Sequence, residues 1–382
     1  MAKILVLANN DVGLYKFRKE LLQELIRLKH IVFISLPNGE YIKPLVEIGC
    51  EFIETPIDRR GKNPIADFKL ILSYLKIMKE VKPDVVLTYT IKPNIYGGIV
   101  CRIRKVPYLV NITGLGTAIE NKGFLQKLAL SLYKVALKKA NCVFFQNESN
   151  QKLFVEKKLI EGNFKLIPGS GVNVNEYNYS DYPLDDKIIK FLFIGRIMKD
   201  KGMDELFSAA DKIKRKYSNV QFNIVGDCEE DYFVEIVRCE KNGIIKYYGR
   251  QNDVRPFIKE THATILPSYH EGTANVLLES ASMGRPVLAS NIPGCRETFV
   301  EGVSGLGFNV KDVDSLVNVI IKFIELPYQN KIAMGISGRK KMEDEFNREL
   351  VIGTYVDEIN ECLNLDYKKA EGRKNVVISK DN

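Results

Sequence analysis

Two glutamates spaced eight positions apart carry the strongest chemical signal in the sequence. Glu271 and Glu279 belong to residues 270–286, HEGTANVLLESASMGRP, which follow an apolar run. Glu279 falls inside the apolar part of an expected helix, where a carboxylate needs partners, and a pair of ribose hydroxyls would supply them. Taken alone, such a pair is more often structural, as a partner of the helix dipole and a solvated or Arg-paired carboxylate.

The loop in front of Glu279 ends where this helix is expected to begin, at about Thr273. Backbone N–H groups freed at a helix N-terminus bind phosphate or sugar oxygens, and a glycine lets the ligand come close. We therefore expect ligand contacts from four consecutive residues: Gly272, Thr273, Ala274 and Asn275.

Two cations stand on a second loop of the same half. Arg196 and Lys201 follow an apolar strand expected at residues 189–194, and so lie where the chain leaves its carboxyl end. A planar guanidinium and a compact ammonium suit the two phosphates of a nucleotide diphosphate and the charge of a departing one. Alone, a basic loop is more often a solvated surface. Combined with Glu271 and Glu279 in one cleft, it predicts a nucleotide-sugar site.

Two successive series of short apolar strands and amphipathic helices must position these residues. The alternation predicts an α/β protein with two Rossmann-like, doubly wound parallel-sheet domains facing across a cleft. Two α/β domains without a shared site are the alternative. The expected parts are an N-terminal domain at 1–170, a linker rich in Gly, Asn, Pro and Ser at 171–187, a second domain at 188–345, a helix at 346–366 that packs back on the first domain, and a polar tail at 367–382.

Composition and length favour a globular protein over a disordered or membrane-spanning one. The chain has 382 residues, of which 45% are hydrophobic and 27% charged, enough for two domains. No stretch approaches the ~18 consecutive apolar residues of a membrane-spanning helix, and the first residues lack the features of a signal peptide. Seven scattered cysteines indicate a reduced, cytoplasmic protein without a Cys zinc site, and three histidines are too few for a His site.

The net charge of +8 is unevenly distributed. Residues 1–180 hold 27 Lys+Arg and 16 Asp+Glu, net +11, whereas residues 181–382 hold 29 and 32, net −3. This asymmetry predicts a polyanionic surface facing the basic half. Nucleic acid is not the expected partner, because basic and aromatic residues are not interleaved and the second half is acidic.

Basic residues of the first half gather in three places. They are residues 59–62, residues 102–105, and the set Lys122, Lys127, Lys134, Lys138 and Lys139. The last set lies along an amphipathic helix, which can rest on an anionic membrane or serve as an ordinary crossover helix. We expect the basic N-terminal domain to face the anionic membrane surface.

The motifs together resemble those of the retaining group 1 (family 4) glycosyltransferases, which have GT-B architecture. The resemblance spans essentially the whole chain and is most specific in the second half. It rests on Glu271 with Glu279, Gly195-Arg196 with Lys201-Gly202, and residues 284–294 and 301–307.

This resemblance implies a role for each residue of the second half. Arg196 and Lys201 would hold the donor diphosphate during catalysis, and Glu271 would contact the hydroxyls of the donor sugar. Glu279 would bind the ribose. Arg250, in the segment YGRQN, would line the pocket of the base, uracil.

The first half resembles the family less specifically. Gly13 corresponds to a family glycine whose backbone approaches the donor phosphates, and Thr113 stands where many members carry a histidine. The loops at 88–98 and 113–123 resemble those of bacterial surface-polysaccharide transferases that act on polyprenyl-diphosphate-linked acceptors. The resemblance implies acceptor contacts from Lys92, Asn94, Thr113 and Gly114, and a donor that is often an N-acetylated amino sugar.

The expected reaction is retaining transfer from a UDP-sugar to a lipid-linked saccharide, in capsule or surface-polysaccharide synthesis at the inner face of the cell membrane. No carboxylate is placed as a nucleophile, so we expect a same-face displacement with the leaving phosphate stabilised by Arg196 and Lys201. No cofactor or metal is expected, because Arg196 and Lys201 supply the positive charge that a metal ion would otherwise supply. The sequence Asp312-Val-Asp314 has the spacing of a metal-binding Asp pair, but it is expected to cap a helix. The alternatives are an epimerase or hydrolase of the same fold and, from another class, a non-catalytic polyanion-binding module.

Overall fold

The computed structural model describes residues 1–382 with the exception of 59–60, 62, 115–122, 186–187, 230 and 379–382. The side chains of 124–125 and 365–378 also lie outside this description. The chain divides into two compact units, the first combining Met1–Ser170 with Val351–Asn382 and the second comprising Gly171–Leu350. Most of the basic cluster at 59–62, and Lys122, lie outside the described residues.

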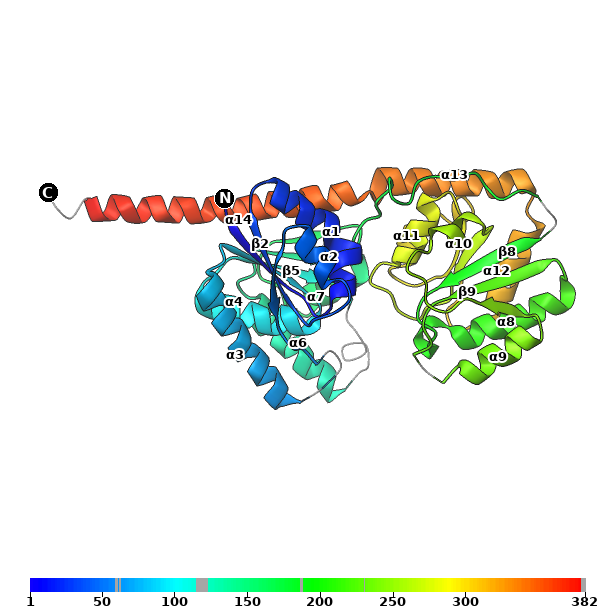
Figure 1. The fold of residues 1–382 in the computed structure, drawn as a ribbon, viewed down its shortest axis with the longest axis horizontal. Coiled ribbons are helices and arrows are strands. Elements are labelled where there is room, and N and C mark those ends of the chain that lie inside the picture. The colour runs from blue at the N-terminus through cyan, green and yellow to red at the C-terminus, as the bar shows by residue number, and fades with distance from the viewer. Residues whose placement is uncertain (59–60, 62, 115–122, 186–187, 230, 379–382) are drawn as a thin grey trace. The chain divides into compact units, whose positions relative to one another are not determined.

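The first unit is built on a seven-stranded parallel sheet of order β3-β2-β1-β4-β5-β6-β7 (Figure 1). Its strands are β1 (Lys3–Leu7), β2 (Ile31–Leu36), β3 (Glu51–Glu54), β4 (Val85–Tyr89), β5 (Tyr108–Ile112), β6 (Cys142–Phe145) and β7 (Phe164–Leu166). Its helices are α1 (Asp11–Arg27), α2 (Ile42–Glu47), α3 (Pro64–Val81), the π-helix η1 (Pro93–Gly97), α4 (Gly98–Arg104), α6 (Phe124–Leu137), α7 (Glu148–Glu156) and α14 (Arg348–Ile378). The order reverses between β1 and β4, where open α/β sheets place ligands beyond the carboxyl strand ends.

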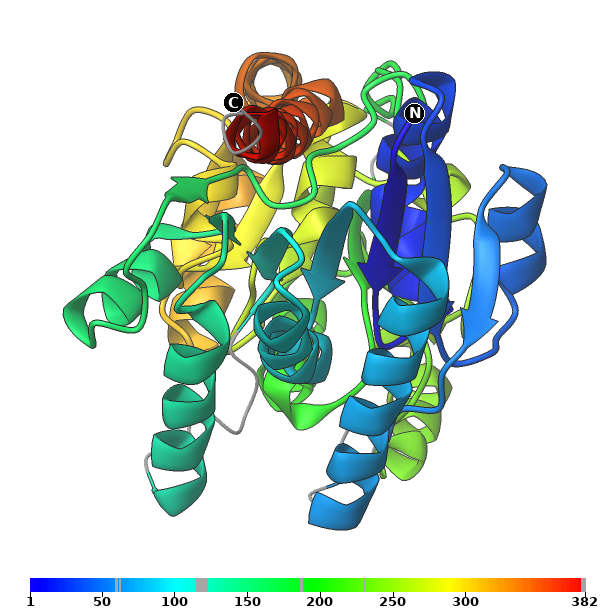
Figure 2. The ribbon, with the colours of Figure 1, turned by 90° about the vertical axis from the view of Figure 1, so that its left-hand side faces the viewer.

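Helices cover both faces of this sheet, as its continuously apolar strands require. In β1, Ile4 and Val6 pack with α1 and α14, whereas the alternate residues Leu5 and Leu7 pack with α3, α4 and α6. Figure 2 shows α3 in blue and α6 in teal, two of the helices that pack on the face with Leu5 and Leu7.

Helix α14 contributes to the core of the first unit although it ends the chain. Four of its side chains belong to that core: Val351, Tyr355, Ile359 and Cys362. The helix continues to Ile378, so the expectation that it ends near residue 366 is wrong. The segment beyond 366 is rich in Lys, Ala, Glu and Arg, and these helix formers extend a helix even where the residues are polar.

The second unit is built on a six-stranded parallel sheet of order β10-β9-β8-β11-β12-β13. Its strands are β8 (Ile189–Ile194), β9 (Val220–Val225), β10 (Ile245–Tyr247), β11 (Ala263–Leu266), β12 (Val287–Ser290) and β13 (Gly305–Phe308). Its helices are η2 (Lys199–Lys201), α8 (Met203–Lys216), α9 (Phe233–Lys241), α10 (Arg255–Lys259), α11 (Asn275–Ser282), η3 (Arg296–Thr298), α12 (Val313–Glu325) and α13 (Tyr328–Glu345). Here the order reverses between β8 and β11.

The predicted pair of doubly wound parallel sheets is confirmed. The predicted cap is also present, because Asp312 Oδ1 accepts a hydrogen bond from the Ser315 N–H at 2.9 Å and begins α12. After β4 the structure has a π-helix over Pro93–Gly97 that continues into α4.

The segment expected to be a linker at 171–187 is instead packed onto the second unit. We call residues 171–183 the strap. The fully buried guanidinium of Arg285 donates to two strap carbonyls, Ser180 O at 2.9 Å and Asp181 O at 2.8 Å. The strap's content of Gly, Asn, Pro and Ser indicates an irregular backbone. This composition does not show that an arginine about a hundred residues later binds that backbone. The linker prediction is therefore wrong for the strap.

Candidate functional site

In the second unit, the loops that follow β8 and β11 touch at the reversal of the strand order. Gly202 has a φ of +69°, and a Cβ there would lie 2.1 Å from the Pro267 carbonyl oxygen. The Tyr269 N–H donates to the Asp200 carbonyl at 2.9 Å. Only glycine permits this approach, which holds the two loops against each other.

Lys201 and Glu271, two of the predicted site residues, form an ion pair across these loops. Lys201 Nζ lies 2.5 Å from Glu271 Oε1, and the two side chains are only 18% and 15% exposed. A pair this buried is screened less by salt than a surface pair, and its members are oriented before a ligand arrives. A cation beside a carboxylate can receive a phosphate oxygen and a sugar hydroxyl from one ligand.

Arg196 lies on the same loop after β8 but makes a different pair. Its Nη1 is 2.9 Å from Glu229 Oε2, and its side chain is 48% exposed. Exposed ion pairs contribute little to stability, so Arg196 can exchange Glu229 for an incoming phosphate at small cost. The sequence analysis missed Glu229, which lies beyond β9 and is recognisable only once β9 is known to neighbour β8.

A second glycine shapes the loop between Glu271 and α11. Gly294 has a φ of +85°, and a Cβ there would lie 2.6 Å from the carbonyl oxygens of both Glu271 and Gly272. The Ala274 N–H donates to the Gly294 carbonyl at 2.8 Å. Backbone contacts with Gly294 therefore help to fix the loop of residues 271–274.

Helix α11 begins at Asn275, two residues later than expected, so Gly272 and Thr273 lie on the loop before it. Its N-cap, Ala274, offers no side-chain acceptor to the first turn. Within the described part of the chain, the buried Oδ1 of Asn275 has no hydrogen-bond partner. A helix start with an unsatisfied amide suits a ligand rich in hydroxyl and phosphate groups.

Glu279 is half-buried on α11, one turn beyond the helix start. The phenol of Tyr177, a strap residue that the sequence analysis did not single out, lies near enough to feel its charge. Burial raises the pKa of Tyr177 far above its ordinary value, and the negative charge of Glu279 raises it further. The phenol therefore stays protonated at neutral pH.

Arg250 lies on the loop after β10, at the same sheet edge as the loops after β8 and β9. Its Nε is 3.9 Å from Asp227 Oδ2, and both side chains are about half exposed. The Gly226 N–H donates to the Gly249 carbonyl at 2.9 Å, which joins the loops after β9 and β10. The structure thus brings Arg250 to the edge expected for the base pocket, and its contact with a base stays a prediction.

In the first unit, Lys92 follows β4 at the reversal of the strand order. Its Nζ is 2.7 Å from Asp67 Oδ1, and the Tyr96 hydroxyl donates to Asp67 Oδ2, also at 2.7 Å. The π-helix brings Lys92 and Tyr96 to one carboxylate, a local geometry often found at functional sites. Burial, together with Asp67, raises the pKa of Tyr96. The sequence analysis missed Asp67 and Tyr96.

Asn94 has a structural environment that argues against the predicted acceptor contact. Its side chain is 1% exposed. Its Oδ1 accepts from the Thr88 hydroxyl at 2.8 Å, and its Nδ2 donates to the Asn111 carbonyl at 2.8 Å. Both ends of the amide are thus used to hold η1 against β4 and β5, and no surface is left for an acceptor.

The remaining predicted residues of the first unit lie at the same edge of its sheet. The Gly13 N–H donates to Asn10 Oδ1 at 2.6 Å, which caps α1, so an approach of phosphate to this backbone stays a prediction. Thr113 and Gly114 follow β5 and are half-buried. The loop that continues from them, residues 115–122, lies outside the described residues.

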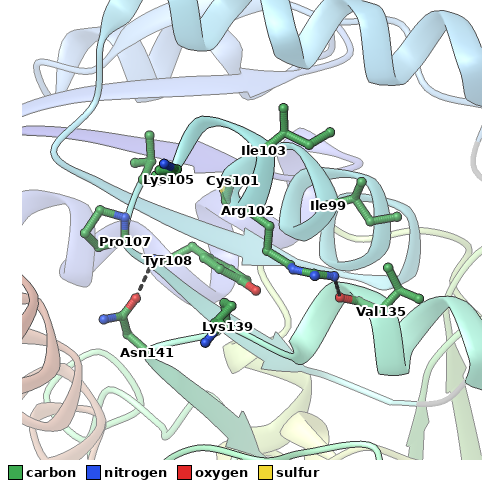
Figure 3. A pocket seen from close by; sticks show the side chains of 11 residues that line it. Ile99, Cys101, Arg102, Ile103, Lys105, Pro107, Tyr108, Val135, Lys139 and Asn141 are labelled. Carbon is green, nitrogen blue, oxygen red and sulfur yellow. Dashed lines mark hydrogen bonds between the residues drawn. The ribbon is translucent and has the colours of Figure 1, made fainter.

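A pocket of about 700 Å³ opens at the opposite edge of the first sheet, where Pro107 precedes β5 (Figure 3). Its lining includes Arg102, Lys105 and Lys139 with apolar side chains such as Ile103, and no carboxylate. Arg102 crosses the pocket to the Val135 carbonyl in α6. None of the predicted site residues lines this pocket, so it is separate from the loops described above.

Both units match known protein families. Residues 176–341 match the family described as glycosyl transferases group 1. Residues 3–147 match the family described as glycosyl transferase 4-like.

Two relatives with named activities cover most of the chain. The N,N'-diacetylbacillosaminyl-diphospho-undecaprenol alpha-1,3-N-acetylgalactosaminyltransferase of Campylobacter jejuni is 26% identical over 336 residues, 84% of this chain and 88% of its own length. The UDP-Gal:alpha-D-GlcNAc-diphosphoundecaprenol alpha-1,3-galactosyltransferase of Escherichia coli is 27% identical over 311 residues, 75% and 78% of the two chains.

A solved structure shares the whole fold. HepE from Anabaena, crystallised with UDP and glucose, superimposes with a TM-score of 0.77 at 19% identity over 94% of this chain and 100% of its own. This likeness shows the GT-B fold, which has two parallel-sheet domains. The chain is a glycosyltransferase of GT-B fold, made of a glycosyl transferase 4-like domain followed by a group 1 glycosyl transferase domain.

Proposed function

We propose that this enzyme transfers an N-acetylated amino sugar from a UDP-sugar to a polyprenyl-diphosphate-linked saccharide, with retention at the anomeric carbon, in capsule or surface-polysaccharide synthesis. Both relatives act, by their names, on sugars linked to diphospho-undecaprenol, and one name specifies UDP-Gal. Both names describe alpha-1,3 transfer of a hexose or an N-acetylated hexosamine. None of the relatives reported above is an epimerase, a hydrolase or a non-catalytic binder, so these alternatives gain no support.

The ion pair of Lys201 and Glu271 is the observation that carries the proposal. In this role Lys201 and Arg196 bind the donor diphosphate, and Glu271 accepts hydrogen bonds from the donor sugar. A fixed cation in a half-buried site stabilises negative charge more strongly than one in water, and it needs no reorganisation during the reaction. Glu279 binds the ribose, and Arg250 lines the base pocket.

The residues before α11 complete the donor site of this proposal. Gly272 and Thr273 offer loop backbone, and Ala274 and Asn275 form the start of the helix. In the first unit Lys92, Thr113 and Gly114 contact the acceptor, and the ammonium of Lys92 suits its diphosphate.

The proposed displacement needs no protein nucleophile. The bond between the anomeric carbon and the β-phosphate oxygen breaks while the acceptor hydroxyl attacks from the same face. The hydroxyl proton passes to the departing phosphate oxygen, and the two cations neutralise the charge of UDP. The enzyme would therefore work without a metal or another cofactor. Among the described residues, no group of three or more His, Cys, Asp or Glu is arranged to hold a metal ion.

Transfer with a defined acceptor tests the proposal. Purified enzyme is incubated with UDP-GalNAc, UDP-GlcNAc, UDP-Gal or UDP-Glc and a short polyprenyl-diphosphate sugar. The masses of the products are then measured by mass spectrometry. We expect one donor to add a single sugar to the lipid-linked acceptor, and little donor to be consumed without acceptor. Donor turnover that is equally fast without acceptor would instead establish the epimerase or hydrolase alternative.

We also propose that one face of the first unit rests on the inner, anionic surface of the cell membrane. Helices α3, α4 and α6, which cover one face of the sheet, expose six apolar side chains: Ile65, Phe68, Leu72, Ile103, Leu128 and Val135. The same helices and their ends expose ten cations: Lys69, Lys76, Lys79, Lys82, Arg104, Lys105, Lys127, Lys134, Lys138 and Lys139. Apolar and basic side chains together are typical of surfaces that lie on membranes. In the described part of the chain, no helix combines the length and apolar character needed to cross a bilayer.

Replacing Lys134 and Lys138 together by alanine is expected to weaken binding to phosphatidylglycerol vesicles about 30-fold, because each cation near the surface contributes about 1 kcal/mol. Vesicle sedimentation measures the effect. The matched control replaces Lys322 and Lys340, two exposed lysines of the second unit, and should bind as the wild type does. Equal loss in both double variants would contradict the proposed membrane face.

A further inference from the structure

The pocket of about 700 Å³ in the first unit lies between the carboxyl ends of helices α4 and α6 and the turn that leads into β5 (Figure 3). We call it the basic pocket, because three cations line it: Arg102, Lys105 and Lys139. The other described residues of its lining are apolar or neutral, and none of them is Asp or Glu. A volume of this size is typical of pockets that bind small ligands.

The positive charge of the basic pocket is not neutralised by the protein. In the described part of the chain, none of the three cations pairs with a carboxylate. Arg102 donates from Nη1 to the Val135 carbonyl, which is neutral, and its buried Nε has no hydrogen-bond partner among the described residues. The side chains of Lys105 and Lys139 are exposed. Three like charges around one hollow create a positive potential that attracts an anion.

The walls of the basic pocket are fixed by hydrogen bonds within the unit. The Tyr108 hydroxyl donates to the Ala136 carbonyl in the last turn of α6 at 2.5 Å, and the Tyr108 N–H donates to Asn141 Oδ1 at 3.1 Å. Figure 3 shows the second of these bonds beneath the lysines. A pocket whose walls are already ordered loses less entropy when a ligand binds.

The position of the basic pocket excludes the acceptor diphosphate as its ligand. Tyr108 begins β5 and Asn141 precedes β6, so the pocket lies at the amino ends of these strands. The predicted acceptor residues Lys92, Thr113 and Gly114 follow the carboxyl ends of β4 and β5. The five residues of β5, at about 3.3 Å each, separate the two edges by about 16 Å. A diphosphate at Lys92 therefore does not reach the basic pocket, and its ligand is a different anion.

The rim of the basic pocket belongs to the proposed membrane face. Ile103 and Val135 line the pocket, are 60% and 47% exposed, and are among the apolar side chains of that face. A lipid could therefore place its headgroup between the cations while its acyl chains stay against the two apolar side chains. A small soluble anion would gain only the charge interaction, because it has no apolar part to cover the rim.

We propose that the basic pocket binds the phosphodiester headgroup of an anionic phospholipid such as phosphatidylglycerol. Lys105 and Lys139 contact the phosphate oxygens as compact charges. Ile103 and Val135 contact the glycerol backbone and the first acyl carbons. This inference rests on the membrane face proposed above. It adds one defined lipid site to a surface that otherwise attracts an anionic bilayer only by its overall charge.

The test measures binding of dihexanoyl phosphatidylglycerol, below its critical micelle concentration, to the purified full-length enzyme by calorimetry. We expect one lipid per chain, and a Kd that rises about 10-fold to 30-fold when Lys105→Gln and Lys139→Gln are combined. The matched control combines Lys134→Gln with Lys138→Gln, which removes the same charge from α6 and its end but not from the pocket lining. A single lipid molecule presents no charged surface, so the control should change this Kd less than twofold.

Two other ligands identify what the pocket recognises. Dihexanoyl phosphatidylcholine has the same chains without a net charge, and glycerol 3-phosphate has the charge without the chains. We expect each to bind at least tenfold more weakly than the phosphatidylglycerol. Equally tight binding of glycerol 3-phosphate would assign the pocket to a soluble phosphate ester, and equally tight binding of phosphatidylcholine would leave no role for its charge. Either result overturns the inference, and so does an equal loss in the two double variants.

Vesicle sedimentation separates this inference from the proposal on which it rests. If the wild type binds phosphatidylglycerol vesicles but not the single lipid, the lipid site is overturned and the membrane face stands. If it binds neither, the membrane face fails as well. Thermal midpoints of both double variants within about 2 °C of the wild type show that a lost affinity is not a lost fold.

Discussion

Replacing Lys201 by alanine is expected to lower kcat about 10²-fold to 10³-fold, which corresponds to about 3–4 kcal/mol of lost transition-state stabilisation. The ammonium lies 2.5 Å from Glu271 in a mostly buried site. Its removal takes away a charge that neutralises the leaving UDP, and it leaves the Glu271 carboxylate facing a diphosphate without a cation beside it. Initial rates at saturating donor and acceptor measure the effect.

Lys199→Ala is the matched control for this variant. Lys199 lies two residues earlier in the same short helix, η2, and is exposed. We expect its replacement to change kcat less than twofold. If Lys201→Ala lost no more activity than Lys199→Ala, the donor diphosphate could not lie against Lys201, and the assignment of the site would have to be withdrawn.

Replacing Arg285 by alanine is expected to lower the free energy of unfolding by about 4 kcal/mol. This guanidinium is 0% exposed and donates to backbone carbonyls of both the strap and residues 258–259. Burial lowers its pKa to about 10, so it is still a cation at neutral pH. Without it, several buried carbonyls lose their donor at once, each a cost of about 1–3 kcal/mol before relaxation.

For a unit of this size, such a loss corresponds to a drop of about 10 °C in the thermal midpoint measured by calorimetry. Arg215→Ala serves as the control, because Arg215 pairs with Asp211 at the surface with its side chain 77% exposed. An exposed pair contributes about 0–1 kcal/mol, so the control should shift the midpoint by no more than about 3 °C. Equal shifts for Arg285→Ala and Arg215→Ala would show that the strap does not depend on Arg285.

The donor loops were predictable because their signals are local. An apolar strand followed at once by a glycine and two cations places Arg196 and Lys201 beyond the carboxyl end of β8. The same reasoning places Glu271 beyond β11. Parallel strands share one carboxyl edge, so residues about seventy positions apart could be expected to meet there.

The strap was misjudged because its structure depends on distant partners. Its composition predicts irregular backbone, and the backbone is indeed irregular. Whether such a segment swings freely or is bound depends on Arg285, Arg339 and Arg348, which lie more than a hundred residues later. Arginine side chains that bind backbone carbonyls leave no pattern in the segment they bind.

The acceptor loop shows the same limit at shorter range. Lys92 and Asn94 are both polar residues that follow β4, and the sequence analysis predicts an acceptor contact from each of them. The π-helix turns Asn94 inward to Thr88 and brings Lys92 to Asp67. The different environments of Lys92 and Asn94 therefore depend on Asp67, Thr88 and the local π-helix, none of which a reading of polar residue types alone could supply.

The central claim is retaining transfer from a UDP-sugar to a lipid-diphosphate-linked saccharide, and the anomeric configuration of the product tests it most directly. The product of the transfer reaction, made from an α-linked UDP-sugar, is examined by proton NMR for the coupling constant at its new anomeric position. The proposed same-face displacement predicts an α-linked sugar on the lipid-linked acceptor. A β-linked product would contradict retention, and free sugar in place of a lipid-linked product would contradict transfer itself.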